Sequence, residues 1–238
     1  MRNIIAIFKK EFRAYFDSPI AYIFITAFLI CSMWIFFKGF FLVGQVIMRG
    51  YFSFLPWLFL FFVPAVTMRL WAEEKKLGTI EVLMTLPVSD YEVIFGKYLA
   101  AYLFLAITVL LSISLPITLA ILGEPDLGPI IGGYLGALLM GGAYLAIGLF
   151  ASSLSENQIV AFILGIVFCF GLFIVGENFV LMAIPSRFVA FFSYLGLGTH
   201  FESIGRGIID SRDIIYYLSV IGFFIFLNIR SLESRKWS

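Results

Sequence analysis

The sequence predicts an all-α, polytopic membrane protein with six transmembrane helices, an N-terminal interfacial helix and a helical re-entrant segment before the last span. The first observation behind this prediction is the composition. Of the 238 residues, 62% are hydrophobic, 18% are aromatic and only 13% are charged. Soluble domains are about 45–50% apolar and about 25% charged. The polar residues are too few to cover a globule in water, so lipid must contact most of the surface.

The second observation is the length and spacing of the apolar runs. A transmembrane helix needs about 20 apolar residues, with some allowance for tilt. Pro116 lies inside the third run, where its ring should kink the helix. The six runs form a single transmembrane domain over residues 1–238, and they cover residues 20–37, 52–68, 98–122, 129–152, 159–180 and 214–229.

The N-terminal stretch, residues 1–17, has apolar residues at helical spacing and basic residues on the other side. This pattern predicts a basic amphipathic helix, an elbow that lies in the membrane interface. A simpler interpretation is that these positive charges only set the orientation of the first span.

The distribution of Lys and Arg predicts the orientation of the chain. With a cytoplasmic N-terminus, eleven of the sixteen Lys and Arg residues fall in segments on the cytoplasmic side. Cytoplasmic segments of membrane proteins carry an excess of these residues. We therefore expect both termini, and the polar segment 69–97, to face the cytoplasm.

That polar segment is the third observation, because it carries four basic and five acidic residues between two spans. Lipid cannot solvate these charges, so the segment must lie in water or against a soluble partner. We expect Gly78 to end the helix that continues from the second span. Thr79 should cap a short helix that ends before Pro87. Ser89 or Asp90 should cap the helix that follows.

A pattern of charged, glycine and leucine positions lies within this segment: Glu74-x-x-x-Gly78-Thr79-x-Glu81-x-Leu83-x-x-Leu86-Pro87-Val88, followed by Gly96-Lys97. Placed between two spans, it resembles the cytoplasmic signature of type-2 ABC transporter permeases, the ABC-2 family. The resemblance is nearest to the short bacterial permeases of gliding-motility and copper-maturation (nitrous-oxide reductase) systems. The six-span layout extends the resemblance to the rest of the chain.

The resemblance implies that the polar segment couples this chain to a separate ATPase, whose groove receives the short helix. It also implies a cytoplasmic (inner) membrane location. The implied partners are two ABC ATPase subunits, a second permease chain, identical or homologous, and the lipid bilayer, but no nucleic acid. ATP and Mg would bind to the ATPase, so no cofactor is expected in this chain. The implied ATPase-coupling residues are Glu74, Gly78, Thr79, Ile80, Glu81, Leu83, Met84 and Pro87. By composition alone, the charged residues would form only a solvated helix tip.

The chain shows no motif for catalysis, and no catalytic, cofactor-binding or metal-binding residue is predicted. Gly96-Lys97 lacks the upstream glycine and the following Ser or Thr of a phosphate-binding loop, so this chain is not expected to hydrolyse ATP. His200 is the only histidine, which excludes a histidine-rich metal site. We expect its side chain to be exposed or interfacial.

Small residues in the fourth span predict close helix packing. Gly132, Gly136 and Gly141 let neighbouring helices approach, either within the chain or at a dimer interface. Residues 181–212 are too many for a simple turn, and we expect an external helical segment of two short helices, split near residues 196–199.

Glu177 and Asn178 lie near the outer end of the predicted fifth span. They indicate either a solvated helix end or a polar constriction, that is, a pathway or external gate. Together these features favour a permease subunit of an ATP-driven ABC transporter, an exporter. The alternative is an ATPase-coupled membrane subunit that transmits force to, or scaffolds, an extracytoplasmic partner without moving a solute. An intramembrane enzyme is disfavoured because paired catalytic groups at membrane depth are missing.

Overall fold

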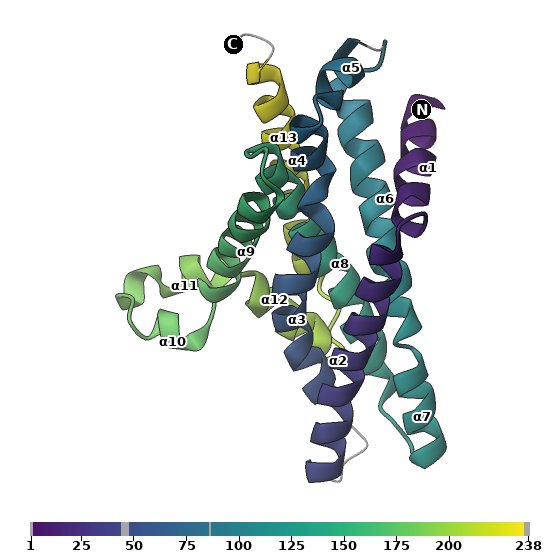
Figure 1. The fold of residues 1–238 in the computed structure, drawn as a ribbon. Coiled ribbons are helices and arrows are strands. Elements are labelled where there is room, and N and C mark those ends of the chain that lie inside the picture. Colours follow the sequence, from purple (N-terminus) through teal and green to yellow (C-terminus); the bar gives the residue numbers. More distant parts are fainter. Residues whose placement is uncertain (1, 44–47, 86, 236–238) are drawn as a thin grey trace.

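A computed structural model describes residues 2–43, 48–85 and 87–235 of the chain. These residues form thirteen helices and no β-strand, so the all-α prediction is confirmed (Figure 1). Five helical stretches are long and apolar enough to cross a membrane, and a sixth apolar helix is shorter, which fits a polytopic membrane protein. The helices are α1 (Arg2–Phe16), α2 (Pro19–Val43), α3 (Arg49–Thr67), α4 (Arg69–Lys76), α5 (Thr79–Thr85), α6 (Asp90–Leu111), α7 (Ser114–Leu122), α8 (Leu127–Ser153), α9 (Gln158–Ile174), α10 (Asn178–Leu181), α11 (Ser186–Leu195), α12 (Leu197–Gly205) and α13 (Ser211–Arg235).

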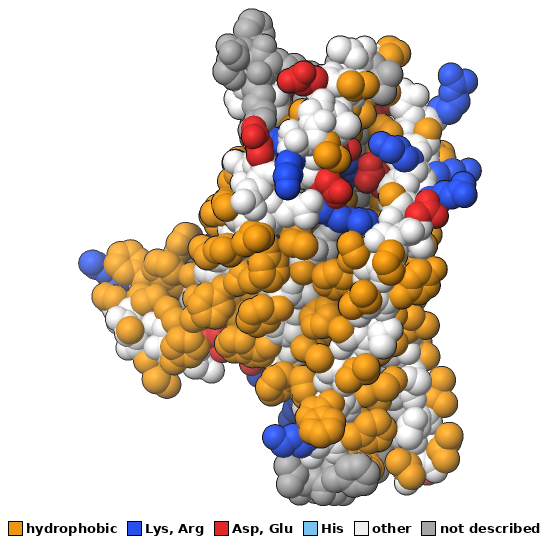
Figure 2. All heavy atoms as spheres, in the orientation of Figure 1, with side chains coloured by type: hydrophobic (Ala, Val, Ile, Leu, Met, Phe, Trp, Pro, Cys, Tyr) orange, Lys and Arg blue, Asp and Glu red, His pale blue; other side chains and the backbone are white. Residues whose placement is uncertain are grey.

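The surface is divided along the long axis of the molecule (Figure 2). Hydrophobic side chains cover most of the face shown, whereas charged side chains gather at the end formed by α1, α4, α5 and the start of α6. The last turns of α13 reach the same end (Figure 1). Because lipid cannot solvate charges, an apolar surface with a charged end suits a protein embedded in a bilayer.

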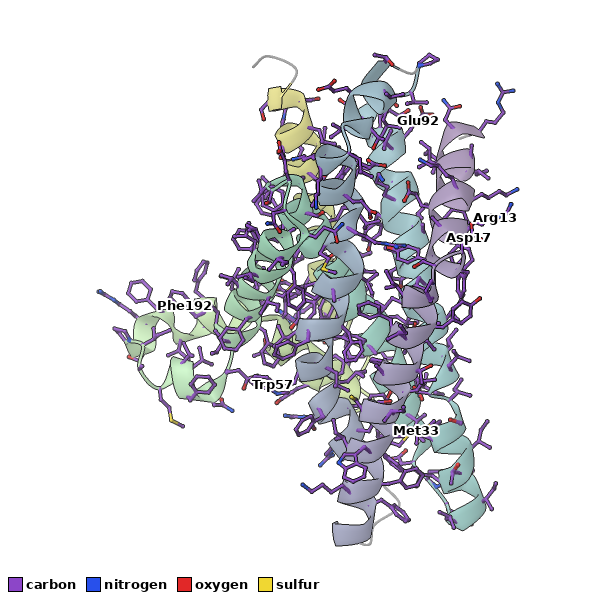
Figure 3. All side chains as sticks on the ribbon, in the orientation of Figure 1. Arg13, Asp17, Met33, Trp57, Glu92 and Phe192 are labelled. Carbon is purple, nitrogen blue, oxygen red and sulfur yellow. The ribbon has the colours of Figure 1, made fainter. Side chains whose placement is uncertain are left out.

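The predicted N-terminal helix, α1, packs along α6. Asn3 of α1 bonds to Glu92 near the start of α6, and the ring of Tyr15 stacks on that of Phe104 with centroids 4.8 Å apart. Because the paired positions advance together along both helices, α1 and α6 run parallel. The apolar face of α1 is therefore covered by protein, while Arg13 points away from the bundle (Figure 3).

The fourth predicted span, α8, is the centre of the bundle. It packs against α3, α6, α9, α12 and α13, and most of its apolar length is buried. A Cβ atom at Gly132 would collide with the carbonyl oxygen of Ile204 in α12, and one at Gly141 with a leucine side chain in α6. Gly136 faces Phe201 of α12. These glycines bring α8 close to helices of its own chain.

The third predicted span is divided into α6 and α7 at Ser112 and Ile113. Pro116 follows four residues after Ser112, and a prolyl ring lacks the N–H of a helix bond and clashes with the carbonyl four residues earlier. The Ser112 hydroxyl lies 2.9 Å from the hydroxyl of Tyr51 and 3.0 Å from that of Tyr134. The predicted kink is confirmed, and polar groups at the break find partners inside the chain.

The fifth predicted span is shorter than expected, and its predicted end at residue 180 is wrong. Helix α9 ends at Ile174, and the chain turns into the short helix α10. The backbone of Gly176 packs directly on that of Gly196: a Cβ atom at Gly176 would lie 2.8 Å from the Cα atom of Gly196. This contact holds the chain in a turn, so α9 cannot continue along its axis.

The segment 181–212 contains α11 and α12, which meet at Gly196, inside the predicted split. Helix α12 is buried against α8. Helices α10 and α11 project sideways from the bundle, level with the hydrophobic surface (Figure 1, Figure 2). A hydrophobic surface extends over this projection, where Phe179, Met182 and Phe191 are exposed.

The close approach at Gly132 generates a stability prediction. Gly132→Ala should lower the thermal unfolding midpoint, because overpacking a tight contact costs about 1–3 kcal/mol. Gly222→Ala in α13 is the matched control, since a Cβ atom there meets nothing within 4 Å. Alanine favours a helix over glycine, so the control should be unchanged or slightly more stable. Equal midpoints for the two purified variants would contradict the packing described for α8.

Candidate functional site

The polar segment forms a helical tip at the charged end of the molecule. Helix α4 continues from α3 and ends at Lys76, and Gly78 adopts a positive φ of 69°, a conformation that favours glycine. The predicted helix stop is therefore present. Thr79 is the first residue of α5, and its hydroxyl donates to the carbonyl oxygen of Glu74 at 3.3 Å. This bond ties the start of α5 back to α4.

A serine of α8 fastens α4 to the centre of the bundle. The Ser152 hydroxyl oxygen accepts hydrogen bonds from the backbone N–H groups of Trp71 (3.1 Å) and Ala72 (3.2 Å). The same hydroxyl donates to the carbonyl oxygen of Met68 at 2.8 Å. Ser152 thus supplies partners for the break between α3 and α4, where the helical bonding is interrupted. One turn further on, the Lys75 ammonium donates to the backbone at the end of α8.

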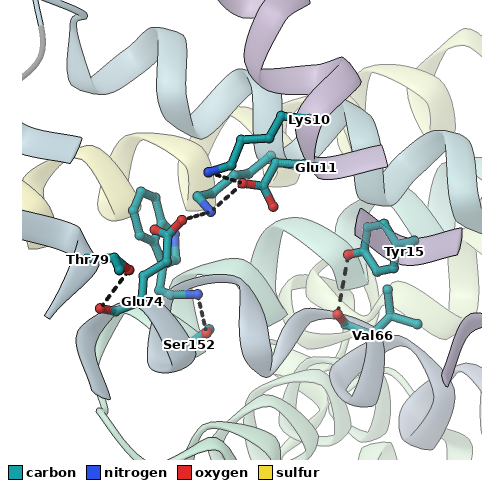
Figure 4. A network of polar contacts seen from close by, with 9 residues as sticks. Lys10, Glu11, Tyr15, Val66, Glu74, Thr79 and Ser152 are labelled. Atoms are coloured by element: carbon teal, nitrogen blue, oxygen red, sulfur yellow. Dashed lines mark hydrogen bonds and ion pairs between the residues drawn. The ribbon is translucent and has the colours of Figure 1, made fainter. Parts of the chain in front are cut away.

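Lys97 joins three helices through a buried ion-pair cluster (Figure 4). Its side chain is 2% exposed, and its Nζ atom lies 2.7 Å from Glu74 Oε1 in α4 and 3.1 Å from Glu11 Oε1 in α1. The Nζ atom also lies 5.1 Å from the centre of the Trp71 ring. A buried ammonium is stable only when it is paired, so Lys97 holds both carboxylates at this place.

Two further contacts fix α1 to its neighbours. Asn3 donates to Glu92 Oε2 at 3.1 Å, and the N–H of Ser89 donates to the same oxygen at 3.3 Å. The Tyr15 hydroxyl donates to the carbonyl oxygen of Val66 in α3 at 3.4 Å. Glu92 lies on α6 at the charged end (Figure 3), and Ser89 precedes α6 as the predicted capping residue.

The short helix α5 has an outer and an inner face. Ile80 and Leu83 are half-buried against the bundle, whereas Glu81, Val82 and Thr85 are exposed. Sequence reasoning missed Val82, although helical spacing places residues 81, 82 and 85 together. Among the other predicted residues, Pro87 is exposed after α5. The side chain of Met84 and all of Leu86 lie outside the described residues.

Glu177 lies beside a cleft of about 360 Å³ between α3, α9 and α12. The charged side chains of Arg49, Glu202 and Arg206 line the cleft. Trp57 also lines it and lies on the side of α3 that faces the short helices α10 and α11 (Figure 3). Burial, and then the nearby Glu202 carboxylate, raise the pKa of Glu177. Asn178 begins α10 and does not line this cleft. Of the two polar residues that the sequence grouped together, only Glu177 lines the cleft.

The expectation that His200 is exposed or interfacial is wrong. Its side chain is 8% exposed, because α12 folds beneath α8 and the start of α13. His200 Nδ1 lies 2.6 Å from Asp213 Oδ1, a partner thirteen residues away that no local sequence pattern indicates. Within the described ranges, no group of three or more His, Cys, Asp or Glu side chains is arranged to hold a metal ion.

The ion-pair cluster generates the prediction for this site. Lys97→Met should lower the thermal unfolding midpoint strongly, because removing one partner of a buried ion pair costs about 3–5 kcal/mol. Lys76→Met removes an exposed lysine of the same segment and should change stability by less than about 0.5 kcal/mol. Adding Glu74→Gln to Lys97→Met should recover part of the loss, since one unpaired carboxylate is gone. If the ion-pair cluster did not contribute to stability, Lys97→Met and Lys76→Met would have equal thermal unfolding midpoints.

Comparison with known protein families identifies one whose model matches this chain. The family model described as "ABC-2 family transporter protein" matches residues 41–201, about two thirds of the chain. The matched region extends from the end of α2 into α12 and includes the α4–α5 tip, the central helix α8 and most of the residues that line the cleft. No individual curated protein matches the chain. Members of this family are membrane permease components of ABC transporters that associate with ABC ATPase subunits and are not themselves catalytic. The chain belongs to the ABC-2 family of transporter proteins.

Proposed function

We propose that this chain is the membrane-spanning subunit of an ATP-driven exporter, coupled to a separate ATPase chain through residues 69–97. The observation that carries the proposal is the fastening of the α4–α5 tip. Ser152 ties α4 to α8, and Lys97 ties it to α6 and α1. Because these contacts are internal to the bundle, a push on α5 would move the spans with it and would not be absorbed by a loose loop.

The predicted coupling residues have different tasks in this proposal. Gly78 and Thr79 set the angle between α4 and α5, and Glu74 holds the base of the tip through Lys97. Ile80 and Leu83 fix α5 to the bundle. Met84 and Pro87 belong to the same proposed coupling segment. Glu81 and the exposed apolar residues Val82 and Leu77 would contact a groove on the ATPase. An apolar contact with a charged rim is a common form of a protein interface.

The proposed assembly has two such chains, identical or homologous, and two ABC ATPase subunits that bind ATP and Mg. The charged end of the molecule, which carries α5, the N-terminus and the end of α13, would face the cytoplasm from the inner membrane. The positive residues of α1 and α4 support this orientation. Glu177 and its cleft would then lie toward the outer side, as part of a pathway or gate.

Replacing the exposed face of α5 tests the coupling role. Glu81→Lys and Val82→Asp should each reduce the ABC ATPase that co-purifies with the tagged chain from its own membranes, because the first reverses a charge of the proposed contact and the second places a charge in its apolar part. Truncating a central interface residue commonly weakens binding by about 1–2 kcal/mol or more, that is, roughly fivefold to thirtyfold. The unfolding midpoint should stay unchanged, since both side chains are exposed.

Glu124→Lys is the matched control, because it reverses the charge of an exposed glutamate between α7 and α8, away from the α5 tip. This control should co-purify the ATPase as the unaltered chain does. Equal amounts of ATPase with all three variants would count against α5 as the coupling element.

A further inference from the structure

Side chains donate hydrogen bonds to the backbone along the whole junction between α11 and α12. The carbonyl groups at the end of α11 have no helical partner, and a buried carbonyl needs a donor. Every carbonyl oxygen from residue 193 to residue 197 accepts a hydrogen bond from a side chain. The donors are Thr199 to Ser193 (2.7 Å) and to Gly196 (2.8 Å), His200 to Tyr194 (2.9 Å), Tyr216 to Leu195 (2.5 Å) and Tyr217 to Leu197 (2.7 Å).

His200 differs from the other donors because its hydrogen bonds depend on how many protons it holds. A carbonyl oxygen can only accept, so the bond to Tyr194 requires a proton on Nε2. The other ring nitrogen, Nδ1, lies 2.6 Å from Asp213 Oδ1, a distance at which a proton must lie between the two atoms. A neutral imidazole beside an ionised carboxylate has only one proton for these two bonds. The geometry requires a second.

We propose that His200 and Asp213 form a proton-binding site that latches the α11–α12 junction to the start of α13. The bound proton is the one between Nδ1 and Oδ1, and with it the pair carries no net charge. This suits a site where both side chains are less than 10% exposed. The inference does not depend on the proposed coupling to an ATPase.

Release of that proton leaves the pair with one hydrogen bond where it had two. The bond from Nδ1–H to the ionised Asp213 carboxylate is charge-assisted and therefore the stronger one. The imidazole keeps it, and Nε2 becomes an acceptor that faces the carbonyl oxygen of Tyr194. Two acceptors repel each other, so the end of α11 separates from α12. The carbonyl oxygen of Tyr194 then has no side-chain donor, and the end of this short helix loosens.

The rings packed around the His200 imidazole are those of three tyrosines. The ring of Tyr216 stacks on the imidazole with centroids 3.9 Å apart, and those of Tyr194 and Tyr217 lie at 5.1 and 6.4 Å. Tyrosines lose their protons only near pH 10 or above, and the same holds for Tyr144, which is buried in α8. Among the described residues, no Lys or Arg lies within 4.0 Å of the Asp213 carboxylate.

The other charged groups near α12 and α13 make their contacts away from the His200–Asp213 pair. Glu177, Glu202, Arg206 and Arg49 line the cleft beside α12. Arg206 pairs with Glu202 at 3.3 Å in an exposed contact. Asp210, which precedes α13, accepts a hydrogen bond from the backbone N–H of Arg212. Asp213 Oδ2 is buried without a hydrogen-bond partner in the described part of the chain, so the carboxylate is held by His200.

Nitrogen NMR of the single histidine tests the proton directly, because no other imidazole signal overlaps with it. The full-length protein, labelled with ¹⁵N-histidine, is measured in lipid nanodiscs at pH 8, where free histidine, with a pKa of about 6.5, is uncharged. Both ring nitrogens of the unaltered protein should give the signal of a protonated nitrogen. One protonated and one bare nitrogen would overturn the proposal.

Two aspartate variants form a matched pair for the same measurement. Asp213→Asn should lose the second proton and show one bare ring nitrogen at pH 8. Asp210→Asn, three residues away, should keep the spectrum of the unaltered protein. An identical spectrum for both variants would overturn the role of Asp213.

The latch itself has a separate readout. Spin labels at Phe188→Cys in α11 and Leu218→Cys in α13, both exposed positions, report the distance across the junction in a chain whose native cysteines are replaced. The distance should increase, or its distribution broaden, over the same pH range in which the NMR signal of the second proton disappears. A distance that stays constant while this proton is lost would overturn the latch.

Discussion

Lipid offers no hydrogen-bond partner, so every interruption of a helix inside this protein must be satisfied by the chain itself. The structure meets this constraint in three places with polar side chains from neighbouring helices. Ser152 serves the break between α3 and α4. At the break between α6 and α7, the Ser112 hydroxyl donates to the carbonyl oxygen of Val109 and is itself bonded to the hydroxyls of Tyr51 and Tyr134. Between α11 and α12, five consecutive carbonyl groups accept bonds from side chains. At each break, side chains of the chain itself supply hydrogen bonds.

The break between α3 and α4 matters most for the proposed function, because α4 extends the bundle beyond its apolar part. Helix α4 carries the chain out to the tip, and Lys97 supplies a second attachment from α6. The cluster also includes Glu11 of α1, so the N-terminal helix is tied to the same place. In a family whose members associate with ABC ATPase subunits, these contacts would give the proposed function a physical route from a soluble partner to the spans.

The sequence predicted those features that depend on local chemistry. Gly78 ended a helix because its positive φ suits glycine, and Pro116 kinked one because its ring removes a helix bond. The features it missed depend on residues that are distant along the chain. Helix α9 stops early because the backbone of Gly176 packs on that of Gly196. His200 is buried because it forms hydrogen bonds with Asp213 and with the backbone of Tyr194. The two faces of α5 lie between these cases. Helical spacing alone places Ile80 and Leu83 on one face and Val82 on the other, but the sequence-based prediction did not include Val82.

The central claim is that the outer face of α5 contacts a nucleotide-hydrolysing partner. The most direct measurement places a photo-crosslinking amino acid at position 82, and in a separate chain at the half-buried position 80, in native membranes. The account predicts a crosslinked product from position 82 that contains an ABC ATPase subunit, and little or none from position 80. Crosslinks from position 82 that contain no ATPase, in membranes where the ATPase is present and active, would contradict it.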